Sequence, residues 1–389
     1  MIMTTMNSLK KNINLHILLF AIFGLALRIV VSNYGYNHDF IMWQKNLELF
    51  KNGESFYAYG KYNYSPLWVN LLFLVDSISL PFIDNQSIFR IKVVLLLSLI
   101  DFFIFFFICK NYSTKIGLLF FLNPISIFIT GFHNQFDNIA ILLAFIAILL
   151  YEKYKNNYQL LITLIIFGIS ICAKQIFFFF PIWLAIKEKK IFKKILILFI
   201  PYLIFFISFI NYIPTDFVYI LENVFQYKSY NNGPFWGMFA PKIIYLYVDK
   251  KVLFFISMLL LGFLFENKNL RDTFYFYIIS VVIFSSAIVN QYLAIPLLTM
   301  AVYWNNKYLY YSIISTLLFF IDGDALNINF LREYFQWDLR STRIMYYPII
   351  LLLLLGFLET VFGKKKISSF ISKMTNTIVH KIKKQLLFK

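Results

Sequence analysis

The chain has 389 residues, of which 60% are hydrophobic and only 14% are charged, and its formal net charge is +17. A soluble domain is closer to half apolar and a quarter charged, so this composition excludes a soluble enzyme, a disordered protein and a fibrous protein. The 48 Phe and 27 Tyr residues make up much of the apolar excess, and the composition predicts a multi-pass membrane protein. Cys109 and Cys172 both lie in apolar runs, which indicates neither a disulfide framework nor a cysteine metal site.

The apolar runs predict helices rather than a barrel. The runs at 195–210 and 345–362 are continuous, whereas barrel strands alternate apolar and polar residues. We therefore expect an all-α, polytopic transmembrane helix bundle of roughly ten to thirteen spans, at about 20 residues for each span. The run at 13–31 is too long for a signal peptide and is expected to be a retained first span. Residues 1–363 then form one transmembrane domain, and residues 364–389 form a basic amphipathic cytoplasmic tail.

Clusters of basic residues indicate which side of the membrane each loop occupies. Lys10-Lys11 and the clusters at 187–194 and 364–366 flank apolar runs, as cytoplasmic clusters do. This orientation puts three longer loops outside, at 32–65, 212–237 and 322–343. The basic residues do not form one patch, so membrane lipids are expected partners and nucleic acid is not.

One run does not fit a simple alternation of spans. Lys153 and Lys155 belong inside, yet counting every apolar run puts them outside. We therefore expect the run at 116–129, which contains Asn123-Pro124, to be a broken or re-entrant element.

The first outer loop is predicted to contain a short amphipathic helix. Apolar residues recur every three or four positions after Asn37, at Phe40, Trp43, Leu47 and Phe50. Gly53 suits the C-cap of this helix. The loop ends at Tyr64-Ser65-Pro66, where Ser65 and Pro66 suit the N-cap and the first position of the next span.

Asp39 stands at the start of this helix, and two interpretations of it stand open. Acidic side chains are common in a first turn, where they cap the helix or favour its positive end. The alternative is a general base that faces a cavity and takes the proton of a substrate hydroxyl.

A second polar group lies at 131–138, between two apolar runs, and includes His133, Asn134, Gln135, Asp137 and Asn138. One interpretation is a loop in which Asp137 caps the following helix. The other is a carbohydrate-binding edge, since sugars are recognised through dense hydrogen bonds to hydroxyl groups.

Two further segments carry polar candidates. Lys174 precedes Gln175 and an apolar stretch, where it either snorkels or holds a lipid phosphate. The segment 226–237 contains an Asn-Gly-Pro turn, and its Lys228 and Trp236 are candidates to face a sugar or a phosphate.

The remaining candidates are weaker. Arg28 is expected to snorkel to the outer interface, and Asp101 is expected to pair within the bundle. Arg332, Arg340 and Arg343 resemble an anion site or headgroup contacts. Asp322-Gly323-Asp324 is an ordinary turn sequence, and no metal is inferred from it.

These motifs, in this order, resemble the GT-C superfamily of integral membrane glycosyltransferases. Asp39, Trp43 and Tyr64-Ser65-Pro66-Leu67 resemble the acidic first loop and the Tyr-Pro-Pro-Leu motif of that superfamily, with Ser65 in place of the first Pro. Segment 133–138 is similar to the His-Phe-Gln-Tyr-Asn stretch of the dolichyl-phosphate-glucose glucosyltransferases and to the Gly-Gln-Phe-Asp of bacterial relatives.

Two later motifs extend the resemblance over about the first two-thirds of the chain. Ala173-Lys174-Gln175-Ile176, followed by Pro181, looks like the Lys-Gln-Met and Pro of these enzymes. Segment 232–236 is loosely similar to their Gly-Leu-Phe loop. The chain also resembles the mannosyltransferases of glycosyltransferase family 87.

The resemblance implies an inverting hexosyltransferase, and the short loops and the lack of eukaryotic sorting features favour a bacterial inner membrane as its location. It would move a hexose, most simply mannose or glucose, from a polyprenyl-phosphate sugar to a lipid-linked or cell-envelope glycan on the extracytoplasmic side. Asp39 would be the catalytic base, and neither a cofactor nor a metal is expected. The implied substrate-binding residues are His38, Tyr64, His133, Asn134, Gln135, Asp137, Lys174, Gln175, Lys228 and Trp236. Lys174, Lys228 and the arginines at 332–343 are candidates to meet the leaving phosphate.

Three alternatives remain open from the sequence. A lipid-glycan flippase or transporter usually has repeats and broken helices, and the 13 Gly are few for that design. An O-antigen-type polymerase would use arginine and histidine in the outer loops. A membrane O-acyltransferase needs a histidine within the bundle, and only His133 is suitably placed.

Overall fold

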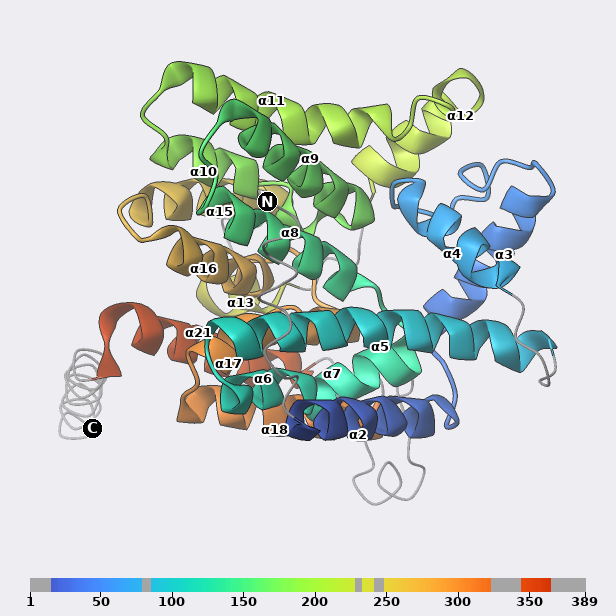
Figure 1. Cartoon of the computed structure of the whole chain (residues 1–389), viewed down its shortest axis with the longest axis horizontal. Coiled ribbons are helices and arrows are strands. Elements are labelled where there is room, and N and C mark those ends of the chain that lie inside the picture. Colours follow the sequence, from blue (N-terminus) through green and yellow to red (C-terminus); the bar gives the residue numbers. More distant parts are fainter. Residues whose placement is uncertain (1–14, 79–84, 228–232, 241–247, 323–343, 365–389) are drawn as a thin grey trace, which may run out of the picture.

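The computed structural model describes residues 15–78, 85–227, 233–240, 248–322 and 344–364. Helix accounts for 78% of these residues, and none of them lies in a β-strand. The predicted all-α class is therefore confirmed for the described part of the chain (Figure 1).

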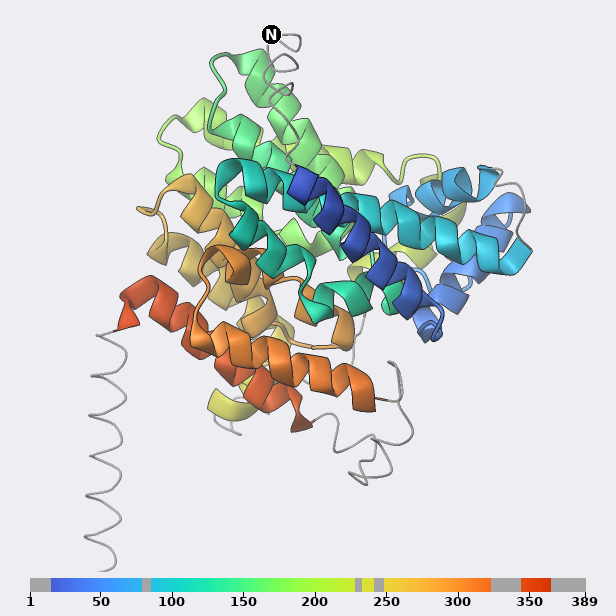
Figure 2. The same cartoon turned by 60° about the horizontal axis from the view of Figure 1, so that its bottom comes forward.

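The helices are predominantly α-helical, and four short π or 3₁₀ turns are labelled η. In chain order they are α2 (Leu15–Ser32), α3 (His38–Lys51), α4 (Leu67–Ser77), α5 (Asn85–Asn111), α6 (Thr114–Phe121), α7 (Pro124–Phe128), η1 (Ile129–His133), α8 (Asp137–Tyr151), α9 (Asn157–Ala173), η2 (Gln175–Phe177), α10 (Phe180–Lys187), α11 (Ile191–Ile207), α12 (Ile213–Ile220), η3 (Leu221–Phe225), α13 (Pro234–Phe239), α15 (Lys250–Leu264), α16 (Leu270–Ile283), η4 (Asn290–Ala294), α17 (Leu297–Val302), α18 (Asn306–Ile321) and α21 (Tyr346–Phe362). Helices α3 and α4 lie at one end of α5 (Figure 1), and α18 packs along α21 (Figure 2).

Two helices, α2 and the Ile88–Asn111 part of α5, are long and apolar enough to cross a membrane. Two bent helix pairs raise the number of candidate spans to four if each pair is one span. These helices suggest a membrane protein, and the described residues do not confirm the roughly ten to thirteen spans expected from composition. Other apolar runs of the described residues form shorter helices, such as α8 with 15 residues and α21 with 17.

The expected break at Asn123-Pro124 is present. Helix α6 and the Pro124–His133 segment bend by 50° relative to each other. Pro124 occupies the first turn of α7, and the Asn123 side chain caps that turn by accepting a hydrogen bond from the Ile125 amide at 3.0 Å. The segment then passes through the π-turn η1 and ends at Asn134, whose φ of 56° is left-handed.

The amphipathic helix of the first loop is also present, as α3. Asn37 is its N-cap, and Phe40, Trp43 and Leu47 are buried. Gly53 has a φ of +72°, and its amide donates to the Phe50 carbonyl at 3.2 Å in a C-terminal cap that suits glycine. Asn37 is the N-cap in place of Asp39, and Asp39 lies in the first turn of α3, where its charge favours the positive end of the helix. The start of α4 differs by one position from the prediction, since Pro66 is its N-cap.

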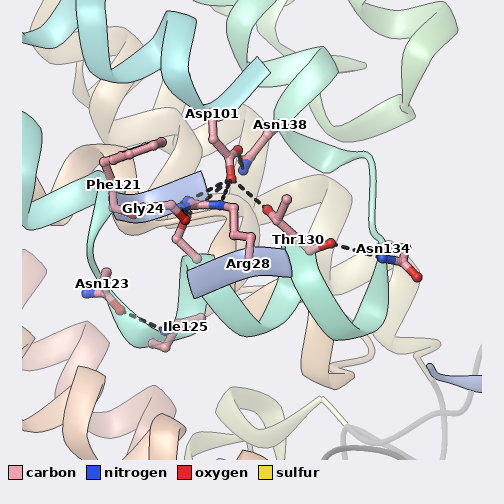
Figure 3. Close-up of polar contacts among 10 residues, drawn as sticks. Gly24, Arg28, Asp101, Phe121, Asn123, Ile125, Thr130, Asn134 and Asn138 are labelled. Atoms are coloured by element: carbon pink, nitrogen blue, oxygen red, sulfur yellow. Dashed lines mark hydrogen bonds and ion pairs between the residues drawn. The ribbon is translucent and has the colours of Figure 1, made fainter. Parts of the chain in front are cut away.

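A buried ion pair joins α2 to α5. Arg28 Nη2 lies 2.9 Å from Asp101 Oδ2, and both side chains are 0% exposed. Asp101 also accepts hydrogen bonds from Thr130 at 2.6 Å and from Asn138 at 2.5 Å (Figure 3). Asp101 therefore pairs within the bundle as predicted, whereas the expectation that Arg28 snorkels is wrong. The carboxylate and nearby carbonyls satisfy the guanidinium inside the bundle, so it has no need to reach the interface.

Candidate functional site

Asp39 meets the second polar segment through Gln135. The Gln135 Nε2 donates a hydrogen bond to Asp39 Oδ2 at 2.6 Å. A second amide, Gln291 of η4, approaches the same oxygen at 3.5 Å. Three segments that are distant in sequence therefore converge on one carboxylate.

The backbone positions both partners. Asp39 lies in the first turn of α3, which buried Phe40 and Trp43 fix against the bundle. Gln135 follows the left-handed Asn134, and its own amide donates to the Ile129 carbonyl at 3.2 Å, which closes the end of η1. The Asn134 side chain donates to the carbonyls of Thr130 and Gly131, at 3.0 and 3.1 Å, and so holds this conformation.

A buried ion pair is formed by Asp137, which follows Gln135 by two residues. Lys174 Nζ is 2.7 Å from Asp137 Oδ2, and the side chains are 8% and 1% exposed. The ammonium also lies 4.9 Å from the centre of the Phe136 ring and 5.6 Å from that of Tyr64. Phe136 in turn stacks on Trp68 with ring centres 4.1 Å apart. Lys174 is therefore enclosed rather than snorkelling.

Two tyrosines share this environment. Desolvation, followed by the Asp39 carboxylate, raises the pKa of Tyr64 well above its ordinary value. Desolvation, followed by the Asp137 carboxylate, raises the pKa of Tyr292 in the same direction. Both phenols therefore keep their protons near the two carboxylates.

Several buried polar atoms around this site have no hydrogen-bond partner among the residues that the structure describes. These atoms are His133 Nε2, Asn134 Oδ1, Gln135 Oε1, Asp137 Oδ1 and Asn138 Oδ1. A buried polar atom without a partner costs about 1–3 kcal/mol, so five of them in six consecutive residues point to a polar ligand or water in this region. The second interpretation of this segment, a polar recognition edge, is thereby favoured over a simple capped loop.

Other predicted residues have different surroundings. His133 contributes its Nδ1 to a hydrogen bond with Asn37 Nδ2 at 3.0 Å, whereas His38 is exposed. Gln175 donates to the Asn63 carbonyl at 3.4 Å. The Trp236 indole donates to the Phe284 carbonyl at 2.8 Å, so its polar atom is engaged with the backbone.

Some predicted candidates lie outside the described residues, namely Lys228, Asp324, Arg332, Arg340, Arg343 and the tail at 365–389. Among the residues that are described, no group of three or more His, Cys, Asp or Glu side chains is arranged to hold a metal ion.

The sequence motifs did not indicate Gln291 or Tyr292. Both lie in the last third of the chain, which was interpreted only as further spans. The available signal was the polar sequence Asn290-Gln291-Tyr292 between two apolar runs, the same kind of interruption that marked segment 131–138.

A comparison of the chain with models of known protein families and with curated proteins finds no match.

Proposed function

We propose that this chain is an inverting membrane hexosyltransferase of GT-C type. Its donor would be a polyprenyl-phosphate sugar, and its acceptor a glycan or glycolipid hydroxyl on the extracytoplasmic side of a bacterial inner membrane. This function gives the Asp39 carboxylate the role of general base.

The contact between Gln135 and Asp39 is the main support for this proposal. A hydrogen-bond donor 2.6 Å from one carboxylate oxygen fixes the orientation of the base. The acceptors of Gln135, Asp137 and Asn138 that lack partners in the described structure are suited to the hydroxyl groups of a sugar.

The reaction balances without a cofactor. Asp39 takes the proton of the acceptor hydroxyl, and the oxygen attacks the anomeric carbon from the face opposite the phosphate. The bond between that carbon and the phosphate oxygen breaks, and its electron pair leaves with the polyprenyl phosphate. The developing charge requires a cation.

Lys174 is the described candidate for that cation, but Asp137 already neutralises it. A phosphate at Lys174 would have to share the ammonium with this carboxylate. Lys228 and the arginines at 332–343 remain alternatives for the same role.

The test is transfer of labelled hexose by membranes that contain the full chain. The donors would be undecaprenyl-phosphate mannose and undecaprenyl-phosphate glucose, each with native lipid-linked glycans as acceptors. Asp39→Asn keeps the size of the side chain but removes the base, and we expect a loss of about 100-fold or more in the rate.

The matched control is Asp76→Asn, which makes the same change at a partly exposed carboxylate that pairs with Lys51. This variant should retain the wild-type rate. Full activity of Asp39→Asn would remove Asp39 as the base. No transfer by the wild type with any donor would instead favour a flippase or a polymerase.

A further inference from the structure

Two adjoining cavities lie between α6, α17, α18 and α21. The first has a volume of about 630 Å³, and its polar lining includes Lys115, Asn305, Thr360 and Lys364. The second has a volume of about 440 Å³ and is lined mainly by apolar side chains of α6 and α18. Leu119 and Trp304 line both, so the cavities form one groove with a polar end and an apolar end. Each volume lies in the range of about 300–1,000 Å³ that is usual for ligand sites.

The polar end carries excess positive charge. Glu359 is paired with Lys307 at 2.8 Å, which neutralises the acidic residue of the lining. Lys115 and Lys364 are exposed, and within the described part of the chain neither forms an ion pair. This end of the groove is therefore complementary to an anion.

The apolar end is open to the surroundings of the protein. Leu309, Ile313 and Leu317 line it, and they are 41%, 46% and 49% exposed. These residues follow one face of α18 at intervals of four, so they form a continuous strip that a hydrocarbon chain can cover.

The groove lies at the opposite end of α5 from Asp39. Lys115 belongs to the first turn of α6, directly after α5 ends, whereas α3 lies near the start of α5 (Figure 1). Lys364 follows the end of α21. Tryptophan and lysine together are typical of the level at which lipid headgroups lie.

We infer that this groove binds an anionic phospholipid, with the phosphate between Lys115 and Lys364 and an acyl chain along Leu309, Ile313 and Leu317. Basic pockets between helices on the cytoplasmic side commonly hold such headgroups. The tail at 365–389 is a poor occupant for the polar end, because it is itself rich in lysine.

The test uses quenching of Trp304 fluorescence in reconstituted full-length protein. The vesicles would be phosphatidylcholine with a minority of phosphatidylglycerol whose acyl chains are brominated, because bromine quenches only tryptophans that it contacts. Comparison with Trp304→Phe isolates the signal of this residue. We expect brominated phosphatidylglycerol to quench Trp304 more strongly than the same amount of brominated phosphatidylcholine.

The variant Lys115→Gln/Lys364→Gln should weaken this preference about ten-fold or more, since each basic residue contributes about 1 kcal/mol to anionic lipid binding. The control Lys45→Gln/Lys61→Gln removes two exposed lysines between the starts of α3 and α4 and should leave the preference unchanged. Ile313→Phe should also reduce quenching of Trp304, because the larger side chain fills part of the apolar end without adding a tryptophan.

Three results would overturn the inference. Equal quenching by the two brominated lipids would exclude selection of the anionic headgroup. Release of the lipid by inorganic phosphate would indicate a simple anion site. Quenching that arises only after residues 365–389 are removed would indicate that the tail occupies the groove.

Discussion

Gln135 and Asp39 are 96 residues apart in the sequence, and a hydrogen bond of 2.6 Å joins their side chains. This contact connects the first turn of α3 with the residues between η1 and α8. The orientation of the carboxylate therefore depends on the π-turn that places Gln135.

The proposed transfer should depend more on Gln135 than on Gln291. Gln135→Leu removes a hydrogen bond to a charged group, a contact worth about 1.5–3 kcal/mol, so kcat should fall about ten- to one-hundred-fold. Gln291→Leu should have a smaller effect, because its amide is 3.5 Å from the same oxygen. The measurement is kcat and KM for hexose transfer by each purified variant.

Gln135→Glu provides a further comparison, since it keeps the shape and places a second carboxylate against Asp39. It should be less active than Gln135→Leu at neutral pH because like charges then repel. Equal rates for Gln135→Leu and the wild type would contradict a positioning role for this amide.

The pair of Arg28 and Asp101 should behave as a unit. Arg28→Met alone or Asp101→Leu alone leaves a buried charge without its partner, and each should destabilise the protein by about 3–5 kcal/mol. The double variant should recover only part of this loss: apolar residues of similar size often replace a buried pair at little cost, but Thr130 and Asn138 then lose the carboxylate that accepts their hydrogen bonds. Thermal unfolding in detergent would measure the coupling.

The surface pair of Lys45 and Glu48 supplies the control for this cycle. Its side chains are 46% and 64% exposed, so its coupling should be below about 1 kcal/mol. A similar small coupling for Arg28 and Asp101 would mean that water reaches the buried pair.

The raised pKa of the Tyr64 phenol should lower the stability of the folded protein at alkaline pH. Desolvation and the Asp39 carboxylate raise the pKa of Tyr64 in the folded protein well above the ordinary value of about 10. Above this ordinary value the unfolded chain loses the proton while the folded protein keeps it, so stability falls as the pH rises. Tyr64→Phe should therefore lose fewer degrees of Tm than the wild type between about pH 9 and about pH 11.

The matched change is Tyr59→Phe, which alters an exposed tyrosine of the same loop. Its alkaline loss of Tm should equal that of the wild type. If Tyr64→Phe instead lost as many degrees of Tm as the wild type at alkaline pH, the Tyr64 phenol would ionise as freely in the folded protein as in the unfolded chain.

Local sequence patterns predicted two elements whose determining residues lie close together in the sequence. The stripe of Phe40, Trp43 and Leu47 with Asn37 before it predicts α3, because capping and periodicity act within a few residues. Asn123-Pro124 predicts the bend before α7 for the same reason.

Features that depend on distant contacts were not predictable in this way. The expected position of Arg28 at the interface was wrong because its partner Asp101 is 73 residues away. The contact between Gln291 and Asp39 spans 252 residues, and no local pattern pairs them. Composition alone also does not separate lipid-facing helices from buried ones, so the number of spans stays a prediction.

The length of α5 separates the two proposed ligands of this protein. A helix of 27 residues extends about 40 Å, which exceeds the hydrocarbon thickness of about 30 Å. The sugar donor near Asp39 and the phospholipid near Lys115 would then belong to opposite leaflets of the bilayer. Neither lipid can displace the other from its site without first crossing the membrane, so a change in the abundance of anionic phospholipid would not compete with the proposed sugar donor.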